Sequence, residues 1–303
     1  MRRIVGAVFA VLALVASIAA IYGYLRVVTL DVERVTDDVH VIYGLGGNVG
    51  VLRTKLGAVI VDTMSFRLQG RQIRERAERL AGPTQAIVNT HYHLDHTHGN
   101  PAFASGMRVL STQRTRAYLG ALDASYWMGD ASGTLPNETF EQDYELRLED
   151  KTVRLLHPGR GHTDGDLVAY FVEDRVVHMG DLFFNRRYPN IDLEAGGSVR
   201  EWVASIDRVL ELDFDTVIPG HGPVTDREGL RAFRHFMQQL AAIGEEVART
   251  GRTLEETLAR ARLDADAGYQ VIAIPFVMRL DREFVIRRTW EEATGRFERV
   301  VLR

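Results

Sequence analysis

The sequence predicts an α/β fold, and two observations indicate this class. In the first third of the chain, a short apolar segment at 58–62, a helical pattern at 65–80 and a second apolar segment at 86–89 follow one another. Strand, helix and strand in this order are typical of βαβ units. Histidines and an aspartate come directly after the second apolar segment, where open α/β sheets build their sites.

The other elements follow from hydrophobic periodicity and from residues that begin or end helices. A linker with an entry strand is expected at 27–36, and a loop or lid at 123–137, which is rich in Gly, Ser, Trp and Tyr. Ser198 and Glu201 have the spacing of a capping box, and Gly251 ends a long helix. Strands are expected at 39–43, 49–53, 144–148, 152–156, 167–171, 175–178 and 216–219, and helices at 112–121, 198–210, 226–249, from 253 and at 281–297.

The composition limits the classes of protein and of metal site. The chain has 303 residues, of which 46% are hydrophobic and 26% charged, as in folded globular proteins. The net charge of -4 gives no sign of a nucleic-acid partner. The chain has no cysteine, so disulfides and thiolate ligands are excluded. A metal would be bound by histidines and carboxylates, which suit zinc, manganese or iron.

The N-terminus has the pattern of an export signal. Met1-Arg2-Arg3 precedes an uncharged, mostly apolar run of 22 residues at 4–25, long enough to cross a bilayer. We expect residues 1–26 to form a signal anchor; a cleaved signal peptide is the alternative, with Ser17-Ile18-Ala19 as its cleavage site. The arginines would stay cytoplasmic. The catalytic domain, 27–303, would then be periplasmic or otherwise extracytoplasmic, anchored to the inner membrane or secreted.

The densest cluster of ligand-type side chains is His91-Tyr92-His93-Leu94-Asp95-His96. Alternate residues of an extended segment share a face, so His91 and His93 can point to one side. Asp95 and His96 then turn toward a neighbouring point. Two metals about 3.5–4 Å apart need such divided ligand sets.

Three more candidates lie in loops that follow predicted strands. They are His162, Asp181 and His221, and a glycine precedes each of them. Glycine allows the backbone a tight turn close to a ligand. Their order after the first cluster indicates one composite site.

With these motifs in this order, the chain resembles the metallo-β-lactamase-fold superfamily over nearly all of its length past residue 35. The resemblance implies a four-layer αββα sandwich with the metals at one edge. It also implies that Asp181 bridges two metals, as in glyoxalase-II-like and lactonase-like members. The best-known β-lactamase subclass has a cysteine in place of Asp181, so an exported member outside that subclass is implied. The first metal would be held by His91, His93 and His162, and the second by Asp95, His96 and His221.

The resemblance implies a hydrolase that attacks the carbonyl of a β-lactam, lactone, ester or thioester with a hydroxide bridging two zinc ions; manganese or iron are alternatives. Asp95 is expected to orient the hydroxide and to shuttle its proton. Asp62 is expected to orient a metal-bound imidazole.

Contacts to a small-molecule substrate are expected from a second group of residues: Asn185, Arg186, Tyr126 and Trp127. Arg187 has the same potential as Arg186. The alternatives are solvent-exposed arginines and plain packing of the two aromatic side chains. His98 is expected to support the ligands from outside the metal-binding set or to start a helix, rather than to bind metal. The histidines at 40, 157, 178 and 235 are expected to be structural or exposed.

Two other functions remain open from the sequence. One is a di-iron redox protein of the same fold, which depends on a flavin-bearing partner. The other is a non-catalytic periplasmic accessory protein that binds metal. The sequence specifies neither the substrate nor the oligomeric state.

Overall fold

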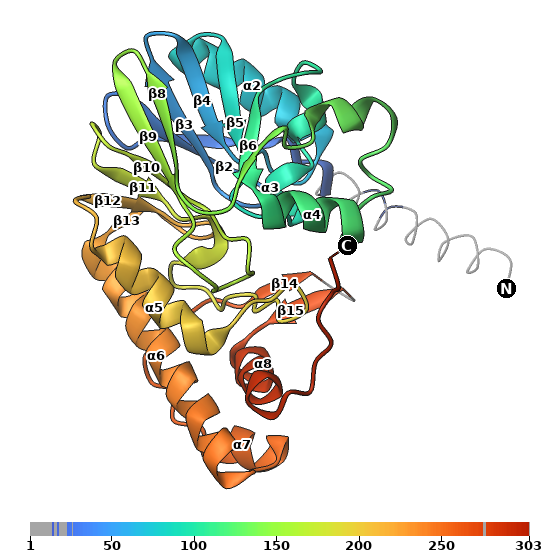
Figure 1. Ribbon diagram of the computed structural model, residues 1–303, viewed down its shortest axis with the longest axis vertical. Helices are drawn as coiled ribbons and strands as arrows, with labels where there is room; N and C mark the ends of the chain where they lie inside the picture. The colour runs from blue at the N-terminus through green and yellow to red at the C-terminus, as the bar shows by residue number, and fades with distance from the viewer. Residues whose placement is uncertain (1–13, 15–16, 18–22, 26, 275–276, 303) are drawn as a thin grey trace, which may run out of the picture.

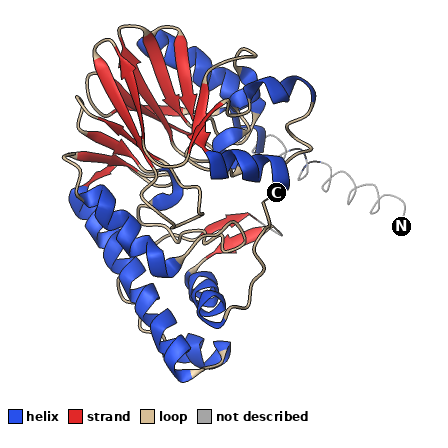
Figure 2. Ribbon diagram, viewed as in Figure 1, coloured by secondary structure: helices blue, strands red, loops and turns tan. Residues whose placement is uncertain are grey.

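A computed structural model describes residues 14, 17, 23–25, 27–274 and 277–302. Two β-sheets pack face to face, and helices cover the outer face of each (Figures 1 and 2). The predicted four-layer αββα sandwich is confirmed. Most of the N-terminal run lies outside the described residues. Among the residues described, no helix has the length and apolar character needed to cross a membrane.

The first sheet has seven strands in the order β1-β2-β3-β4-β5-β6-β7. Strands β1 to β4 pair antiparallel, and β4 to β7 pair parallel. The strands are β1 (Asp31–Arg34), β2 (Val39–Tyr43), β3 (Val49–Thr54), β4 (Gly57–Val61), β5 (Thr84–Val88), β6 (Val109–Thr112) and β7 (Glu138–Phe140).

The second sheet has six strands in the order β13-β12-β11-β10-β9-β8. Only the β11–β12 pair is parallel. The strands are β8 (Tyr144–Leu148), β9 (Lys151–Leu156), β10 (Val168–Phe171), β11 (Val176–His178), β12 (Thr216–Ile218) and β13 (Thr225–Asp226). A separate hairpin pairs β14 (Ile272–Ile274) with β15 (Met278–Leu280).

The helices lie between the strands in the chain. The α-helices are α2 (Arg67–Ala81), α3 (Leu94–Thr97), α4 (Gln113–Leu122), α5 (Val199–Leu210), α6 (Arg227–Thr250), α7 (Leu254–Arg260) and α8 (Arg282–Thr294). The 3-10 helices are η1 (Asn100–Ala102), η2 (Gly129–Thr134) and η3 (Gly180–Leu182).

Three apolar clusters hold the four layers together. The first lies between the sheets and joins Val59 and Val88 to Leu155 and Phe171. The second lies between the first sheet and the face of α2 that carries Ile73. The third and largest packs the second sheet against α5, α6 and α8. Burial of both faces explains why the central strands have continuous apolar runs.

The predicted capping box at Ser198 forms only in half. The Ser198 hydroxyl accepts from Glu201 N–H, but the Glu201 carboxylate binds Arg160 instead of returning to the N-cap. The side chain of Glu292 from α8 accepts from both Ser198 Oγ and Val199 N–H. This contact joins α8 to the start of α5.

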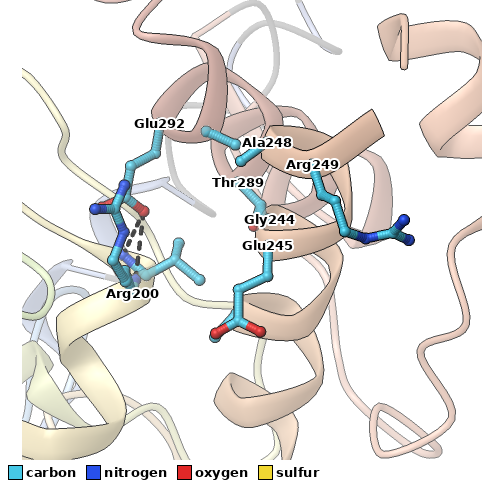
Figure 3. Close-up of a pocket in the computed structure, with 10 residues that line it drawn as sticks. Arg200, Gly244, Glu245, Ala248, Arg249, Thr289 and Glu292 are labelled. Atoms are coloured by element: carbon cyan, nitrogen blue, oxygen red, sulfur yellow. Dashed lines mark hydrogen bonds between the residues drawn. The ribbon is translucent and has the colours of Figure 1, made fainter. Parts of the chain in front are cut away.

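The sequence did not predict some of the observed elements. Strands β6 and β7, the β14–β15 hairpin and the 3-10 helix η2 within the predicted lid are additions. A cavity of about 380 Å³ lies among α5, α6 and α8, and none of the seven candidate ligands lines it (Figure 3).

Candidate metal centre

The seven candidate ligands come from both sheets and meet at one edge of the sandwich. Four of them, His91, His93, Asp95 and His96, follow β5 and extend into α3, in the part of the chain that forms the first sheet. The others follow β9, β11 and β12 of the second sheet. The structure brings all seven together: His91, His93, His162 and Asp181 form one group of potential ligands, and Asp95, His96 and His221 form another.

The first group presents three imidazole nitrogens to one point. His93 Nδ1 lies 3.1 Å from His91 Nε2 and 2.8 Å from His162 Nε2. Asp181 Oδ2 lies 3.8 Å from His91 Nε2 and 3.7 Å from His162 Nε2.

The second group lies on the other side of the same carboxylate. Asp181 Oδ1 lies 3.1 Å from His96 Nε2 and 3.4 Å from His221 Nε2. Asp95 Oδ2 lies 3.3 Å from His221 Nε2 and 3.7 Å from His96 Nε2. The two oxygens of Asp181 therefore face two separate ligand sets.

These spacings fit metal ions. A tetrahedral zinc ion with bonds of about 2.0–2.1 Å needs donor atoms roughly 3.3 Å apart. The buried atoms His96 Nε2 and Asp181 Oδ1 have no hydrogen-bond partner among the residues that the structure describes. Buried polar atoms are rarely left unsatisfied, so these two are free to bind a cation.

Asp62 orients imidazoles of both groups. It follows β4, is fully buried and has a φ of 65°, a left-handed conformation that aspartate tolerates better than most residues. Its carboxylate accepts from His96 Nδ1 at 2.7 Å and from Thr90 Oγ1 at 2.7 Å. Because the Thr90 hydroxyl donates to Asp62, its oxygen accepts from His91 Nδ1 at 3.1 Å. The structure thus places Asp62 in the expected position and adds a link to His91 through Thr90.

Asp192 is not a candidate ligand but supports one of them, a role that the sequence does not predict. Its carboxylate accepts from His93 Nε2 at 3.0 Å and from the Tyr92 hydroxyl at 2.5 Å. The carbonyl of Asn190, two residues earlier, accepts from His162 Nδ1 at 3.0 Å. Hydrogen bonds of this kind fix the tautomer of a ligating imidazole. No motif surrounds Asp192, and only the fold brings it close to His93.

The imidazoles of the centre differ in the direction of their pKa shifts. Burial lowers the pKa of His162 to about 4 and that of His91 well below its usual value, so both are neutral. Burial opposes protonation of His221 as well, but the negative charges of Asp181 and Asp95 raise the pKa of His221 to about 9. Although burial favours its neutral form, the charges of His96 and His221 lower the pKa of Asp95. The carboxylates thus favour positive charge at the second group, where a metal ion would replace the imidazole protons.

The predicted lid is fastened to the metal-binding loop. Tyr126 stacks on His98 with ring centroids 3.6 Å apart, and its hydroxyl donates to the His98 carbonyl. Asp123 accepts from His98 Nε2 and from Trp127 Nε1. Trp127 is only 4% exposed and packs against Leu119. These contacts agree with the alternative that Tyr126 and Trp127 are packing residues. A contact of either side chain with substrate stays a prediction.

The loop after Asp181 carries the other predicted substrate contacts. Asn185 is buried, and its side chain donates to the Pro223 carbonyl, which holds the turn next to His221. Arg186 is exposed, with a φ of 54°. Arg187 is half-buried, and its Nε has no hydrogen-bond partner in the described part of the chain. Contacts from these residues to substrate remain predictions.

The sequence matches the model of a known protein family. The model of the metallo-β-lactamase superfamily matches residues 42–221, more than half of the chain and the span that holds every candidate ligand. The α subunit of 2,4-dinitroanisole O-demethylase from Nocardioides sp. is 26% identical over 222 residues, which are 73% of this chain and 64% of that protein. A linear primary-alkylsulfatase from Pseudomonas sp. is 26% identical over 262 residues, covering 70% of this chain and 49% of that protein. The chain therefore spans less than two thirds of either relative.

Solved structures agree with the fold. A metallo-β-lactamase from Pontibacter korlensis superposes with a TM-score of 0.60 at 23% identity, covering 69% of this chain and 99% of that one. The family match, the shared sandwich and the His/Asp groups at its edge lead to one conclusion. The chain belongs to the metallo-β-lactamase superfamily.

Proposed function

We propose that the protein is a hydrolase that uses two divalent metal ions, zinc in preference to manganese or iron. Its substrate would be a β-lactam, lactone, ester or thioester, attacked at the carbonyl carbon. The observation that carries this proposal is the placement of Asp181 between two ligand sets, with one oxygen toward each. A single metal would leave His96 and His221 without a role. When bound, two such ions make a shared water nucleophilic near neutral pH and polarise the substrate carbonyl.

Residues of the chain bind the metals and handle the proton. Asp95 is 29% exposed at its side chain, and the lowering of its pKa keeps it ionised. It can accept the proton of the attacking water and deliver it to the leaving group. The neutral imidazoles of His91 and His162 bind a metal without first losing a proton.

The test is a hydrolysis screen on protein whose metal content is measured in the same sample. The panel holds a β-lactam, a lactone, a carboxylic ester and a thioester, together with an alkyl sulfate and an aryl methyl ether for the chemistry named in the two relatives. We expect two zinc ions per chain and turnover of a carbonyl substrate. His93→Ala should abolish turnover, whereas His235→Ala, at an exposed position on α6, should leave it unchanged.

Other results would select another function. Absence of turnover across the panel contradicts the proposed hydrolase. So does an activity that His93→Ala leaves unchanged. Iron in place of zinc together with electron transfer from a flavin donor favours the di-iron redox alternative. Two bound ions without any turnover favour the non-catalytic accessory protein.

We also propose that residues 4–25 attach the protein to a membrane, with the metal centre outside the cytoplasm. The support is the uncharged run between Arg3 and Arg26. Fractionation of cells that express the full chain should place it with membranes, and a chain that starts at residue 27 should be released. Recovery of both forms in the cytosol would contradict this proposal.

A further inference from the structure

A closed ring of four hydrogen bonds lies directly behind two of the candidate ligands. Asn48 N–H donates to the Gly220 carbonyl at 2.8 Å, and Gly220 N–H donates to the Gly180 carbonyl at 2.8 Å. Gly180 N–H donates to His178 Nδ1 at 3.2 Å. The ring closes where His178 Nε2 donates to the Asn48 carbonyl at 3.1 Å.

The ring fixes the tautomer of His178. Since Gly180 N–H is a donor, Nδ1 carries no proton, and the hydrogen of the neutral imidazole is on Nε2. His178 is fully buried at the end of β11. Gly50 faces it across the sheets, and a Cβ at that position would lie 2.9 Å from His178 Cδ2. The glycine therefore leaves room for the imidazole.

The ring joins the two sheets at the metal centre. Asn48 directly precedes β3 of the first sheet, whereas His178 ends β11 of the second. The Asn48 side chain adds two bonds of 2.8 Å, to the carbonyls of Pro219 and Gly222. These carbonyls lie on either side of His221, so Asn48 holds the turn that carries it.

Two members of the ring each stand next to a candidate ligand. Asp181 follows Gly180, and His221 follows Gly220. Any Cβ at Gly220 would collide with the Asp181 carboxylate and with the Gly180 backbone. The separation of 3.4 Å between Asp181 Oδ1 and His221 Nε2 thus depends on how closely the two glycine turns approach.

We infer that His178 and Asn48 are positioning residues that set the distance between Asp181 and His221 and so determine the occupancy of the second metal position. Neither side chain is among the candidate ligands. The first metal position depends on the ring only through Asp181, because His91, His93 and His162 have partners of their own in Thr90, Asp192 and the Asn190 carbonyl. This inference rests on the proposed two-metal function.

The experiment is a zinc titration of the full chain, with metal content measured by mass spectrometry and with cobalt(II) absorption as an optical readout. For His178→Phe, which removes both ring contacts of the imidazole, we expect affinity for the second ion to fall about 10- to 100-fold while the first ion stays bound. Asn48→Ala should weaken the same ion. His178→Asn, whose amide oxygen can accept from Gly180 N–H, should recover most of the loss.

A control separates positioning from loss of stability. Val177→Ala lies next to His178 but belongs to the apolar cluster under the helices. It should lower the melting temperature while both ions keep their affinities. Unchanged affinity for both ions in His178→Phe overturns the inference alone, as does an equal loss of both ions in His178→Phe and Val177→Ala. A wild-type protein that binds a single ion overturns the proposed two-metal function and the inference together.

Discussion

At the residue scale, one buried carboxylate serves both halves of the metal centre. Asp62 binds His96 directly and His91 through Thr90. Its role toward an imidazole could be predicted from its place at the end of an apolar strand. The equivalent role of Asp192 could not, because 99 residues separate it from His93 and no local pattern marks it.

Asp62→Asn should weaken metal binding. An amide at this position cannot accept from both His96 and Thr90 with the strength of a carboxylate, so we expect a loss of about 10- to 100-fold in affinity. Isothermal titration with zinc measures it. Asp123→Asn is the matched control, because Asp123 also accepts from an imidazole, that of His98, but in the lid. Equal losses in the two variants would contradict the role given to Asp62.

The raised pKa of His221 makes the stability of the metal-free protein depend on pH. The pKa of about 9 in the folded state exceeds the usual 6.5, so folding is favoured by bound protons. This contribution is complete below pH 6.5 and is lost as the pH rises through about 9. We expect the urea midpoint of metal-free protein to fall over this range. The fall should be smaller in His221→Asn, and an identical fall in both proteins would refute the assignment.

At the element scale, the helices were predicted better than the short strands. Amphipathic periodicity and end signals locate α6, with Asp226 as N-cap and Gly251 as C-cap. Strand β6 has only four residues, and its last residue, Thr112, is also the N-cap of α4. Such a segment is too short for a periodic signal. The half-formed capping box shows a second limit, because Glu201 has a stronger partner in Arg160 that only the fold supplies.

The contact from α8 to the start of α5 should contribute to stability. In Figure 3 the Glu292 carboxylate points at the first turn of α5, beside the cavity. Glu292→Ala removes the acceptor for Ser198 Oγ and Val199 N–H, and we expect a loss of about 1–2 kcal/mol in the free energy of unfolding. Urea denaturation measures it. Glu283→Ala, an exposed pair partner of Arg287 on the same helix, should cost less than about 0.5 kcal/mol; a similar cost for both would argue against the cap.

At the scale of the whole molecule, the layers followed from a resemblance carried by a few motifs. Periodicity alone gave βαβ units, and neither the division into two sheets nor the strand order could be derived from it, since register and pairing depend on contacts far apart in the chain. The ligand loops were recognisable because each combines a glycine with a ligand-type side chain after a strand. Their convergence is a property of the fold.

Removal of the metals should destabilise the entire sandwich. Ligands that bind only the folded state stabilise it by roughly 4 kcal/mol per ion when the free ion is at 1,000 times its Kd. We expect a chelator to lower the melting temperature, with a smaller shift for His93→Ala, which has already lost a ligand. An unchanged melting temperature on chelation would show that the ions do not bind the folded protein tightly.

Each candidate metal position draws ligands from both sheets: His91 and His93 with His162, and Asp95 and His96 with His221. An ion at either position is consequently a cross-link between two halves of the polypeptide, 31–140 and 144–226. Zinc binding would therefore stabilise the association of the two halves, to an extent that depends on the free zinc concentration. Two separately expressed fragments, cut in the exposed link at 141–143, should therefore associate through the apolar core between the sheets and associate more tightly with zinc than with a chelator.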